Sequence, residues 1–454
     1  MLHGTKRSLL PGRKRKYYVD ATLGLDANDG RSPSSAWQTE AAINGNTNLR
    51  YGDRIHFKRG ETWTLAAGLA VPTHGLYFGA YGAGADPILD GDAAFNSFTT
   101  NSNDSITIEN IRFTNGSEFG LVISNSYNVH IKDVQADDCP NDNVIFTTNS
   151  HGCTIENLTS FTPSGAAIGN SCLEIKDGCH DITVINPTLH TAAGTGLFIT
   201  SHNPLQGDCF PYNITVIGGH IYDCKYGIFV NKPDADVNAD RNINIDGVLI
   251  DGTCAYGIYL QSEGQPINGL IFDNMLVYLH NVAAQYGVYC IGEAEFRRSV
   301  LAGTYPAVRV DTGGDVRLIN CTLYRDGVNP LHIRNNPIST YMRNCILYSV
   351  GATPIYVQSI TGVEDIDYNL YFPTIGDPVT DTAYNWNGTA YDWADWKTNS
   401  GQDANSPIPA DPTFVNIATP DFTLQAGSPA INAGVDVGLP YSGIAPDCGA
   451  FERE

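Results

Sequence analysis

Short runs of alternating apolar and polar residues recur through the middle of the chain, at intervals of roughly 20–30 residues. Each repeat holds two such runs, and alternation with a period of two is typical of β-strands, not of helices. The first runs are 106–113, 129–136, 153–160, 182–189, 214–221, 243–250, 270–277 and 316–323. The second runs are 120–124, 143–147, 172–176, 196–200, 227–231, 257–261, 287–291, 307–311, 330–334 and 354–358.

Two apolar positions, spaced two residues apart, recur in every second run. The first position holds Leu121, Val144, Leu173, Leu197, Ile228, Ile258, Val288, Val308, Leu331 and Ile355. The second holds Ile123, Phe146, Ile175, Ile199, Val230, Leu260, Cys290, Val310, Ile333 and Val357. Stacked repeats would bury each position as a column. The sequence therefore predicts an all-β fold, a parallel β-helix solenoid with N- and C-terminal caps.

The repeat divides the chain into four parts. Residues 1–16 form a basic segment, 17–103 an N-terminal cap with the first coils, 104–360 the solenoid, and 361–454 a C-terminal capping region. The caps are expected because the ends of a stacked coil expose unpaired strand edges. Asparagine recurs at the bend after the first strand, where stacked amides can bond to one another, at Asn110, Asn157, Asn186, Asn274, Asn320 and Asn344.

The flanks of the repeat carry more specific motifs, namely YYVD (17–20), DANDG (26–30), GDRIHFKRGETW (52–63), FTLQAGSPAINAG (422–434) and DCGAFE (447–452). They resemble the flanks of right-handed parallel β-helix proteins of the pectate-lyase-like superfamily. That superfamily includes polysaccharide lyases, glycoside hydrolases, uronate epimerases and phage tail spikes. The resemblance implies a right-handed coil and a sugar polymer as ligand, and the tail spikes imply a homotrimer or other virion proteins as partners.

The residue between the two inward positions must point outward. This column reads Val122, Ile145, Glu174, Phe198, Phe229, Tyr259, Tyr289, Arg309, His332 and Tyr356, and Arg334 lies in the next outward column. Coils about 4.8 Å apart would give an exposed aromatic ladder with a pitch close to one sugar ring. We therefore predict that Phe198 to Tyr356, with Arg334, bind substrate. The alternative is that a loop, a terminal segment or a neighbouring subunit covers these rings.

Charged residues beside this column are the candidates for catalysis. Elimination at a uronate needs a base and an acid, for which we select Lys176 and His202, with Glu174 and Asp177 beside them. Hydrolysis would instead use two carboxylates, from Glu174 and Asp177 or from the loop 136–143. In that loop Asp138 and Asp142 are also candidate ligands for Ca²⁺, the one cofactor that the lyases imply. A lyase is favoured over a hydrolase.

Composition narrows the class of protein further. The formal net charge is −22, which argues against nucleic acid as a partner. No run reaches the roughly 18–20 apolar residues of a membrane helix, and no signal peptide is seen. The 11 cysteines lack zinc spacing and are predicted to be buried thiols. With the basic segment, these features favour a viral origin. Together with the resemblance, they lead us to expect a protein that binds and degrades polysaccharide, as a phage tail depolymerase does, located in the virion or outside the cell. The alternative is a non-catalytic virion structural or host-adsorption protein.

Overall fold

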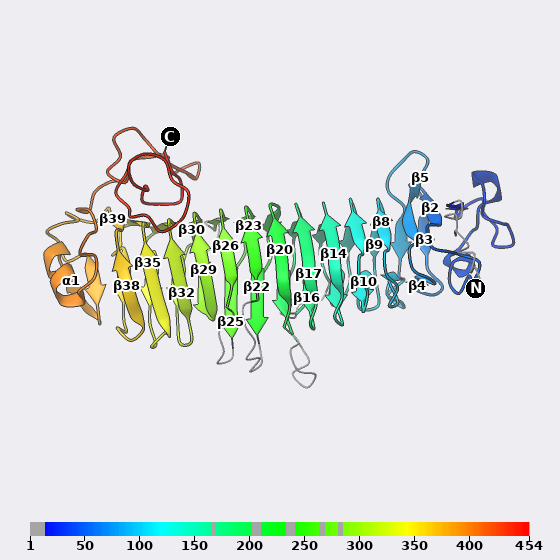
Figure 1. Ribbon diagram of the computed structural model, residues 1–454, viewed down its shortest axis with the longest axis horizontal. Coiled ribbons are helices and arrows are strands. Elements are labelled where there is room, and N and C mark those ends of the chain that lie inside the picture. The colour runs from blue at the N-terminus through cyan, green and yellow to red at the C-terminus, as the bar shows by residue number, and fades with distance from the viewer. Residues whose placement is uncertain are drawn as a thin grey trace, which may run out of the picture.

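The computed structural model describes residues 14–164, 167, 169–201, 210–232, 241–262, 268–279 and 285–453. Within these residues the chain forms an elongated solenoid in which strands of successive coils lie side by side (Figure 1). Three long sheets run along its length, and every pair of neighbouring strands within them is parallel, apart from one hairpin at the C-terminal end of the third sheet. The predicted parallel β-helix is confirmed.

Sheet A is the first sheet that each coil visits. Its strands, in spatial order, are β1 (Lys16–Val19), β2 (Arg54–Lys58), β5 (Tyr77–Tyr81), β8 (Thr107–Glu109), β11 (His130–Lys132), β14 (His151–Glu156), β17 (His180–Ile185), β20 (Tyr212–Ile217), β23 (Ile243–Asp246), β26 (Leu270–Asp273), β29 (Glu293–Arg297), β32 (Asp315–Ile319), β35 (Ser339–Arg343) and β38 (Val363–Asp367).

Sheet B follows sheet A in each coil, after a sharp bend. Its strands are β3 (Thr62–Thr64), β6 (Ile88–Asp90), β9 (Arg112–Thr114), β12 (Gln135–Asp137), β15 (Thr159–Phe161), β18 (Thr188–His190), β21 (His220–Tyr222), β24 (Leu249–Asp251), β27 (Leu276–Tyr278), β30 (Val300–Ala302), β33 (Thr322–Asp326), β36 (Ile346–Val350) and β39 (Leu370–Pro373).

Sheet C closes each coil and carries the candidate site. Its strands are β4 (Leu69–Ala70), β7 (Phe98–Thr99), β10 (Leu121–Ser124), β13 (Val144–Thr147), β16 (Ser171–Lys176), β19 (Thr195–Thr200), β22 (Tyr226–Lys232), β25 (Tyr256–Ser262), β28 (Tyr286–Ile291), β31 (Val308–Val310), β34 (Leu331–Ile333), β37 (Ile355–Val357), β40 (Tyr384–Trp386) and β41 (Thr389–Tyr391).

The two apolar columns predicted from the second runs form the sheet C wall of the core. Each of their residues, from Leu121 and Ile123 to Ile355 and Val357, has no exposed surface. Strand register keeps like positions together, since Leu121 pairs with Val144 and Val144 with Leu173. Burial of these columns in one continuous core is the main force that holds the coils together.

The bend between sheets A and B explains the recurring asparagines. All six predicted positions have φ between 49° and 56°, the left-handed region in which asparagine is the most tolerant residue after glycine. The amide of Asn344 donates to Oδ1 of Asn320 at 3.2 Å, so two of them stack as predicted. Others donate to acids of the preceding coil, as Asn157 does to Asp133 at 2.7 Å.

The ten described cysteines are buried and unbridged, as predicted, while Cys209 lies outside the described residues. Cys321 and Cys345 are neighbours in successive coils, and the backbone N–H of Cys321 donates to Sγ of Cys345. Burial raises the pKa of Cys290 to about 12, which keeps that thiol protonated. The cysteines therefore act as small apolar residues of the core.

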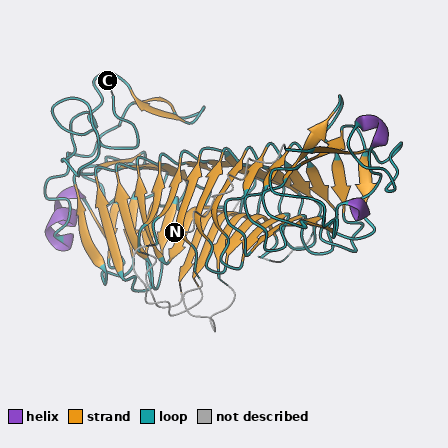
Figure 2. Cartoon of the chain, turned by 45° about the vertical axis from the view of Figure 1, so that its right-hand side comes forward, coloured by secondary structure: helices purple, strands orange, loops and turns teal. Residues whose placement is uncertain are grey.

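Irregular segments close both ends of the solenoid. At the N-terminal end are the short 3-10 helices η1 (Pro33–Ser35) and η2 (Glu40–Ala42), with Trp37 stacked on Tyr17 at 4.7 Å. At the other end helix α1 (Trp393–Ser400) covers the last coil (Figure 2). The chain then folds back along sheet B, where the hairpin β42 (Phe414–Asn416) and β43 (Asp421–Leu424) packs against Tyr348 and Leu370. In the part of the chain that the structure describes, no helix is long and apolar enough to cross a membrane.

Glycine in sheet C permits close contact between coils, which gives a first prediction. An added Cβ on Gly257 would lie 2.5 Å from Cγ1 of Val277 and 2.7 Å from the carbonyl oxygen of Gly287. Gly257→Ala is therefore expected to lower the free energy of unfolding by about 1–3 kcal/mol, measured by urea denaturation. The control is Gly169→Ala, because among the described residues a Cβ there would meet only Phe198, at 4.0 Å. Equal stability of the two variants would contradict the packing argument.

Candidate functional site

The outward column of sheet C has the register that the sequence predicts. Glu174 pairs with Phe198, Phe198 with Phe229, and the pairing continues through Tyr259, Tyr289, Arg309, His332 and Tyr356. The side chains of this column therefore lie one above another along the solenoid axis. The residues that the sequence selects as substrate-binding share one face.

The aromatic rings of this column are stacked on each other. Ring centroids are 4.9 Å apart for Phe198 and Phe229, 4.9 Å for Phe229 and Tyr259, and 5.4 Å for Tyr259 and Tyr289, with planes tilted by 12°, 22° and 21°. These separations are close to the spacing of the coils, so strand pairing itself brings the rings together.

A second ladder, absent from the sequence prediction, runs beside the first. Tyr226 stacks on Tyr256 at 5.1 Å, and Tyr256 stacks on Tyr286 at 5.3 Å. Each of these tyrosines precedes an inward glycine, so the repeated Tyr-Gly at the start of three second runs was the available signal. The two ladders touch side by side, and we call them together the sheet C platform: Phe198, Tyr226, Phe229, Tyr256, Tyr259, Tyr286 and Tyr289.

Exposure along the platform is uneven, and this corrects part of the prediction. Phe198 and Phe229 are only 3% exposed and form an apolar cluster with Tyr226, separate from the solenoid core. The expectation of an exposed ladder is therefore wrong for these two rings. Tyr259 and Tyr289 are half-buried, so the accessible part of the platform lies over β25 and β28.

The stacking also changes which atoms a ligand would meet. Neighbouring rings occupy much of each other's faces, so between rungs a ligand would contact ring edges and hydroxyls instead of flat faces. Burial, with the neighbouring Tyr289, raises the pKa of Tyr259 to about 12, so this phenol keeps its proton. The platform is thus a row of neutral hydroxyls on an apolar base.

Two arginines and one carboxylate close the platform at its far end. The Arg309 guanidinium lies 4.8 Å from the Tyr289 ring centroid and donates to the Tyr286 hydroxyl at 3.0 Å. Asp311 pairs with Arg309 at 2.7 Å and with Arg334 at 3.7 Å. Burial opposes ionisation of Asp311, but hydrogen bonds from Arg309 and its neighbours prevail and lower its pKa. Two cations therefore share one anion, which leaves this end positive.

The last two predicted binding residues lie just beyond this cluster. The rings of His332 and Tyr356 meet edge to face at 4.9 Å. Burial, reinforced by Arg334 and Arg309, lowers the pKa of His332 to about 4, so the imidazole is neutral at pH 7. His332 therefore adds no positive charge to the arginine end.

The predicted catalytic residues lie at the opposite end of the platform. Lys176 Nζ is 3.0 Å from Glu174, whose side chain is 1% exposed. Asp142 lies near Glu174 and accepts from the backbone N–H of Ser171 at 2.8 Å. Burial raises the pKa of Asp142 to about 6. Two carboxyls and one ammonium are thus brought together beneath the surface.

The positions of these three residues affect both predicted reactions, elimination and hydrolysis. Lys176 forms an ion pair with Glu174, and its role as a base stays a prediction. Glu174 and Asp142 are both buried, and hydrolysis by Glu174 with Asp177, or by the acids of the loop 136–143, stays a prediction as well. His202, the candidate acid, lies outside the described residues.

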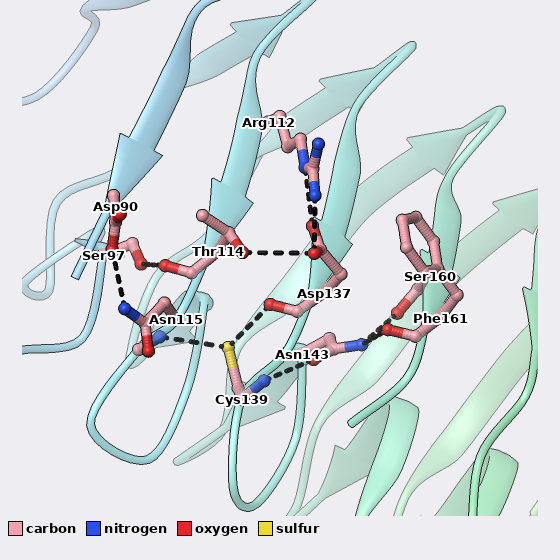
Figure 3. A network of polar contacts seen from close by, with 11 residues as sticks. Asp90, Ser97, Arg112, Thr114, Asn115, Asp137, Cys139, Asn143, Ser160 and Phe161 are labelled. Carbon is pink, nitrogen blue, oxygen red and sulfur yellow. Dashed lines mark hydrogen bonds and ion pairs between the residues drawn. The ribbon is translucent and has the colours of Figure 1, made fainter. Parts of the chain in front are cut away.

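The remaining acids of the region have separate surroundings. Asp177 lies in the turn after β16 and accepts from the Thr147 hydroxyl at 3.2 Å. Asp137 accepts two hydrogen bonds from Arg112, both at 2.7 Å, and a third from Thr114 (Figure 3). These contacts hold neighbouring coils of the solenoid together.

The two predicted calcium ligands differ in their exposure to solvent. Asp138 is exposed, whereas Asp142 is buried beside Glu174. Over the described residues, no group of three or more His, Cys, Asp or Glu side chains is arranged to hold a metal ion. Calcium binding by Asp138 and Asp142 stays a prediction.

The chain has similar proteins among the solved structures. No protein-family model matches the chain, and no curated protein matches it. The complex of XylC with xylose has 8% identity and a TM-score of 0.51 over 80% of this chain and 86% of that one. PfbA, a surface adhesin of Streptococcus pneumoniae, has 12% identity and a TM-score of 0.50 over 76% and 92%.

Pectate lyase Pel9A matches over 97% of both chains, with 17% identity and a TM-score of 0.45. The chain folds as a right-handed parallel β-helix. The resemblance predicted from the flanking motifs thus holds for the fold. Identities of 8–17% do not extend it to activity, so the function of this β-helix has to be argued from its own side chains.

Proposed function

We propose that the protein binds a polysaccharide along the sheet C platform. One observation carries the proposal: tyrosine hydroxyls recur along the solenoid axis, coil by coil, on an apolar base outside the core. A polysaccharide offers hydroxyls at a similar repeat, and phenols can both donate and accept hydrogen bonds. The half-buried Tyr256, Tyr259, Tyr286 and Tyr289 are the residues expected to contact it.

We further propose that the polysaccharide is acidic. The support is the excess of one positive charge where Arg309 and Arg334 share Asp311, in a chain whose formal net charge is −22. A guanidinium held over Tyr289 can pair with a carboxylate or sulfate on a sugar bound to the adjacent rung.

The test is a binding screen of the full chain against matched acidic and neutral polysaccharides, namely alginate, pectate and chondroitin beside dextran and xylan. Saturable binding of an acidic polymer, weakened by salt, is expected. If no polymer binds, the proposal that the platform binds polysaccharide is wrong. If only the neutral polymers bind, the proposal that the polysaccharide is acidic is wrong. Ultraviolet absorbance by a new carbon–carbon double bond and the reducing-end count, followed in the same samples, report lyase and hydrolase activity separately.

Cleavage and the virion role stay predictions. In this structure Glu174 has no exposed surface and Asp142 is 3% exposed, so neither is open to a sugar chain. The predicted homotrimer would have to leave the Tyr259–Tyr289 part of the platform open if it binds glycan. Sedimentation of the protein with and without the bound polysaccharide tests that requirement.

A further inference from the structure

A second site, distant from the platform, lies on sheet A in the first coils of the solenoid. It is a cavity of about 220 Å³ lined by Lys14, Tyr51, Gly52, Arg54, Gly75, Leu76, Tyr77, Ser105 and Thr107. This volume is below the roughly 300–1,000 Å³ of pockets for drug-sized ligands, so it suits a small group. Nothing in the proposed polysaccharide site uses these residues.

The charged side chains that line the pocket are all positive. It contains two cations, Lys14 and Arg54, and four hydroxyl-bearing residues, but no carboxylate, although acids outnumber bases 48 to 26 in the chain. The nearest acids have partners of their own: Asp53 pairs with Arg15, Asp104 pairs with His74 at 3.1 Å, and Glu109 accepts from Tyr77 at 2.8 Å. The lining itself therefore carries two cations and no carboxylate.

The donors are held in place before any ligand arrives. The guanidinium of Arg54 lies 3.8 Å from the centroid of the Tyr77 ring, which fixes its plane. Its Nε is buried without a hydrogen-bond partner among the described residues. Ser105 Oγ accepts from the Asn128 amide at 3.1 Å, which leaves its own hydrogen to donate elsewhere.

Gly75 shapes the rim of the pocket. Its φ is 72°, and a Cβ there would lie 2.1 Å from the Tyr51 ring, so only glycine lets this exposed ring lie against the turn. We infer that this pocket binds a small oxyanion, a carboxylate, sulfate or phosphate, through Arg54, Lys14 and the hydroxyls of Ser105 and Thr107.

The test is calorimetric titration of the full chain with sodium sulfate, sodium phosphate and sodium glucuronate at constant ionic strength. We expect one site for at least one of these anions, and Arg54→Gln should weaken it about tenfold or more, because a charge-assisted contact is lost. Lys14→Gln, at an exposed side chain, should weaken it severalfold without affecting the fold. Binding of glucuronate alone would identify the source as a sugar acid, and binding of sulfate or phosphate would show that the free oxyanion suffices.

The matched control is Arg317→Gln. Arg317 lies 4.0 Å over the Tyr341 ring on the same sheet, so the substitution removes the same kind of cation–π contact away from the pocket. It should leave the affinity unchanged. The inference fails if the unsubstituted chain binds none of the three anions, or if Arg54→Gln and Lys14→Gln both bind them as tightly as Arg317→Gln does. Because the site is separate from sheet C, this result is independent of polysaccharide binding by the platform.

Discussion

Alanine at both Tyr259 and Tyr289 is expected to weaken polysaccharide binding by about 100-fold. Each side chain supplies a ring edge and a hydroxyl at the accessible part of the platform, and losing such an aromatic contact typically costs more than about 1 kcal/mol. Stability should fall only slightly, because both rings are half-buried and lie outside the solenoid core. Titration of the polysaccharide and a thermal melt of the same sample measure the two effects.

Two further variants show whether weaker binding comes from the lost hydroxyls or from lost packing. Phenylalanine at both positions keeps the stacked rings and removes the hydroxyls, so it should reduce affinity about tenfold and leave the melting temperature unchanged. Alanine at Tyr127 and Tyr212 is the matched control, since these tyrosines end a stacked ladder on sheet A. Equal loss of binding in this control, or a large loss of stability in the Tyr259 and Tyr289 variant, would show that the platform is a packing surface.

Asp403 is expected to produce the largest effect on stability. Its carboxyl has no exposed surface and accepts from Tyr371 Oη, Trp396 Nε1 and Ser406 Oγ at 2.9, 2.9 and 2.6 Å. These contacts bind helix α1 and the start of the C-terminal segment to the last coil. Asp403→Ala would leave three buried donors without an acceptor, so we expect a loss of about 3–5 kcal/mol in urea denaturation.

The same residue predicts a pH dependence. Burial raises the pKa of Asp403 to about 7, against about 3.9 in an unfolded chain. Between pH 4 and 7 the folded state therefore holds a proton that the unfolded state releases, so stability from this residue falls as pH rises and levels off above pH 7. The fall should be on the order of 4 kcal/mol, and Asp403→Asn should flatten it. An unchanged pH profile in Asp403→Asn would contradict this assignment.

The fold was predictable because one period dominates the sequence. Side chains alternate between the core and the surface along each strand, and inward residues of successive strands form columns such as Leu121–Val144–Leu173. A shift of one strand by one residue would turn its apolar side chains outward, so the apolar pattern determines the strand register. The outward columns follow from the same register, which is why the sequence alone predicts the Phe198–Tyr289 ladder. Asn320 and Asn344 were likewise predictable, because their bend needs a left-handed residue.

The site was less predictable because it depends on contacts across the face of the sheet. The repeat could not reveal that Asp142 reaches Glu174, since the two come from the loop before β13 and from β16. Nor could it reveal that Phe198 and Phe229 are covered, or that stacking removes ring faces from a ligand. Burial and ring orientation depend on neighbours that a periodic pattern does not specify.

The most direct test of the central proposal is hydroxyl-radical footprinting with the acidic polysaccharide that binds best in the screen. Binding along sheet C predicts that oxidation of Tyr256, Tyr259, Tyr286 and Tyr289 falls at saturation, while Tyr127 and Tyr441, exposed elsewhere, are oxidised as before. Unchanged oxidation of the four platform tyrosines under saturating polysaccharide would contradict the account.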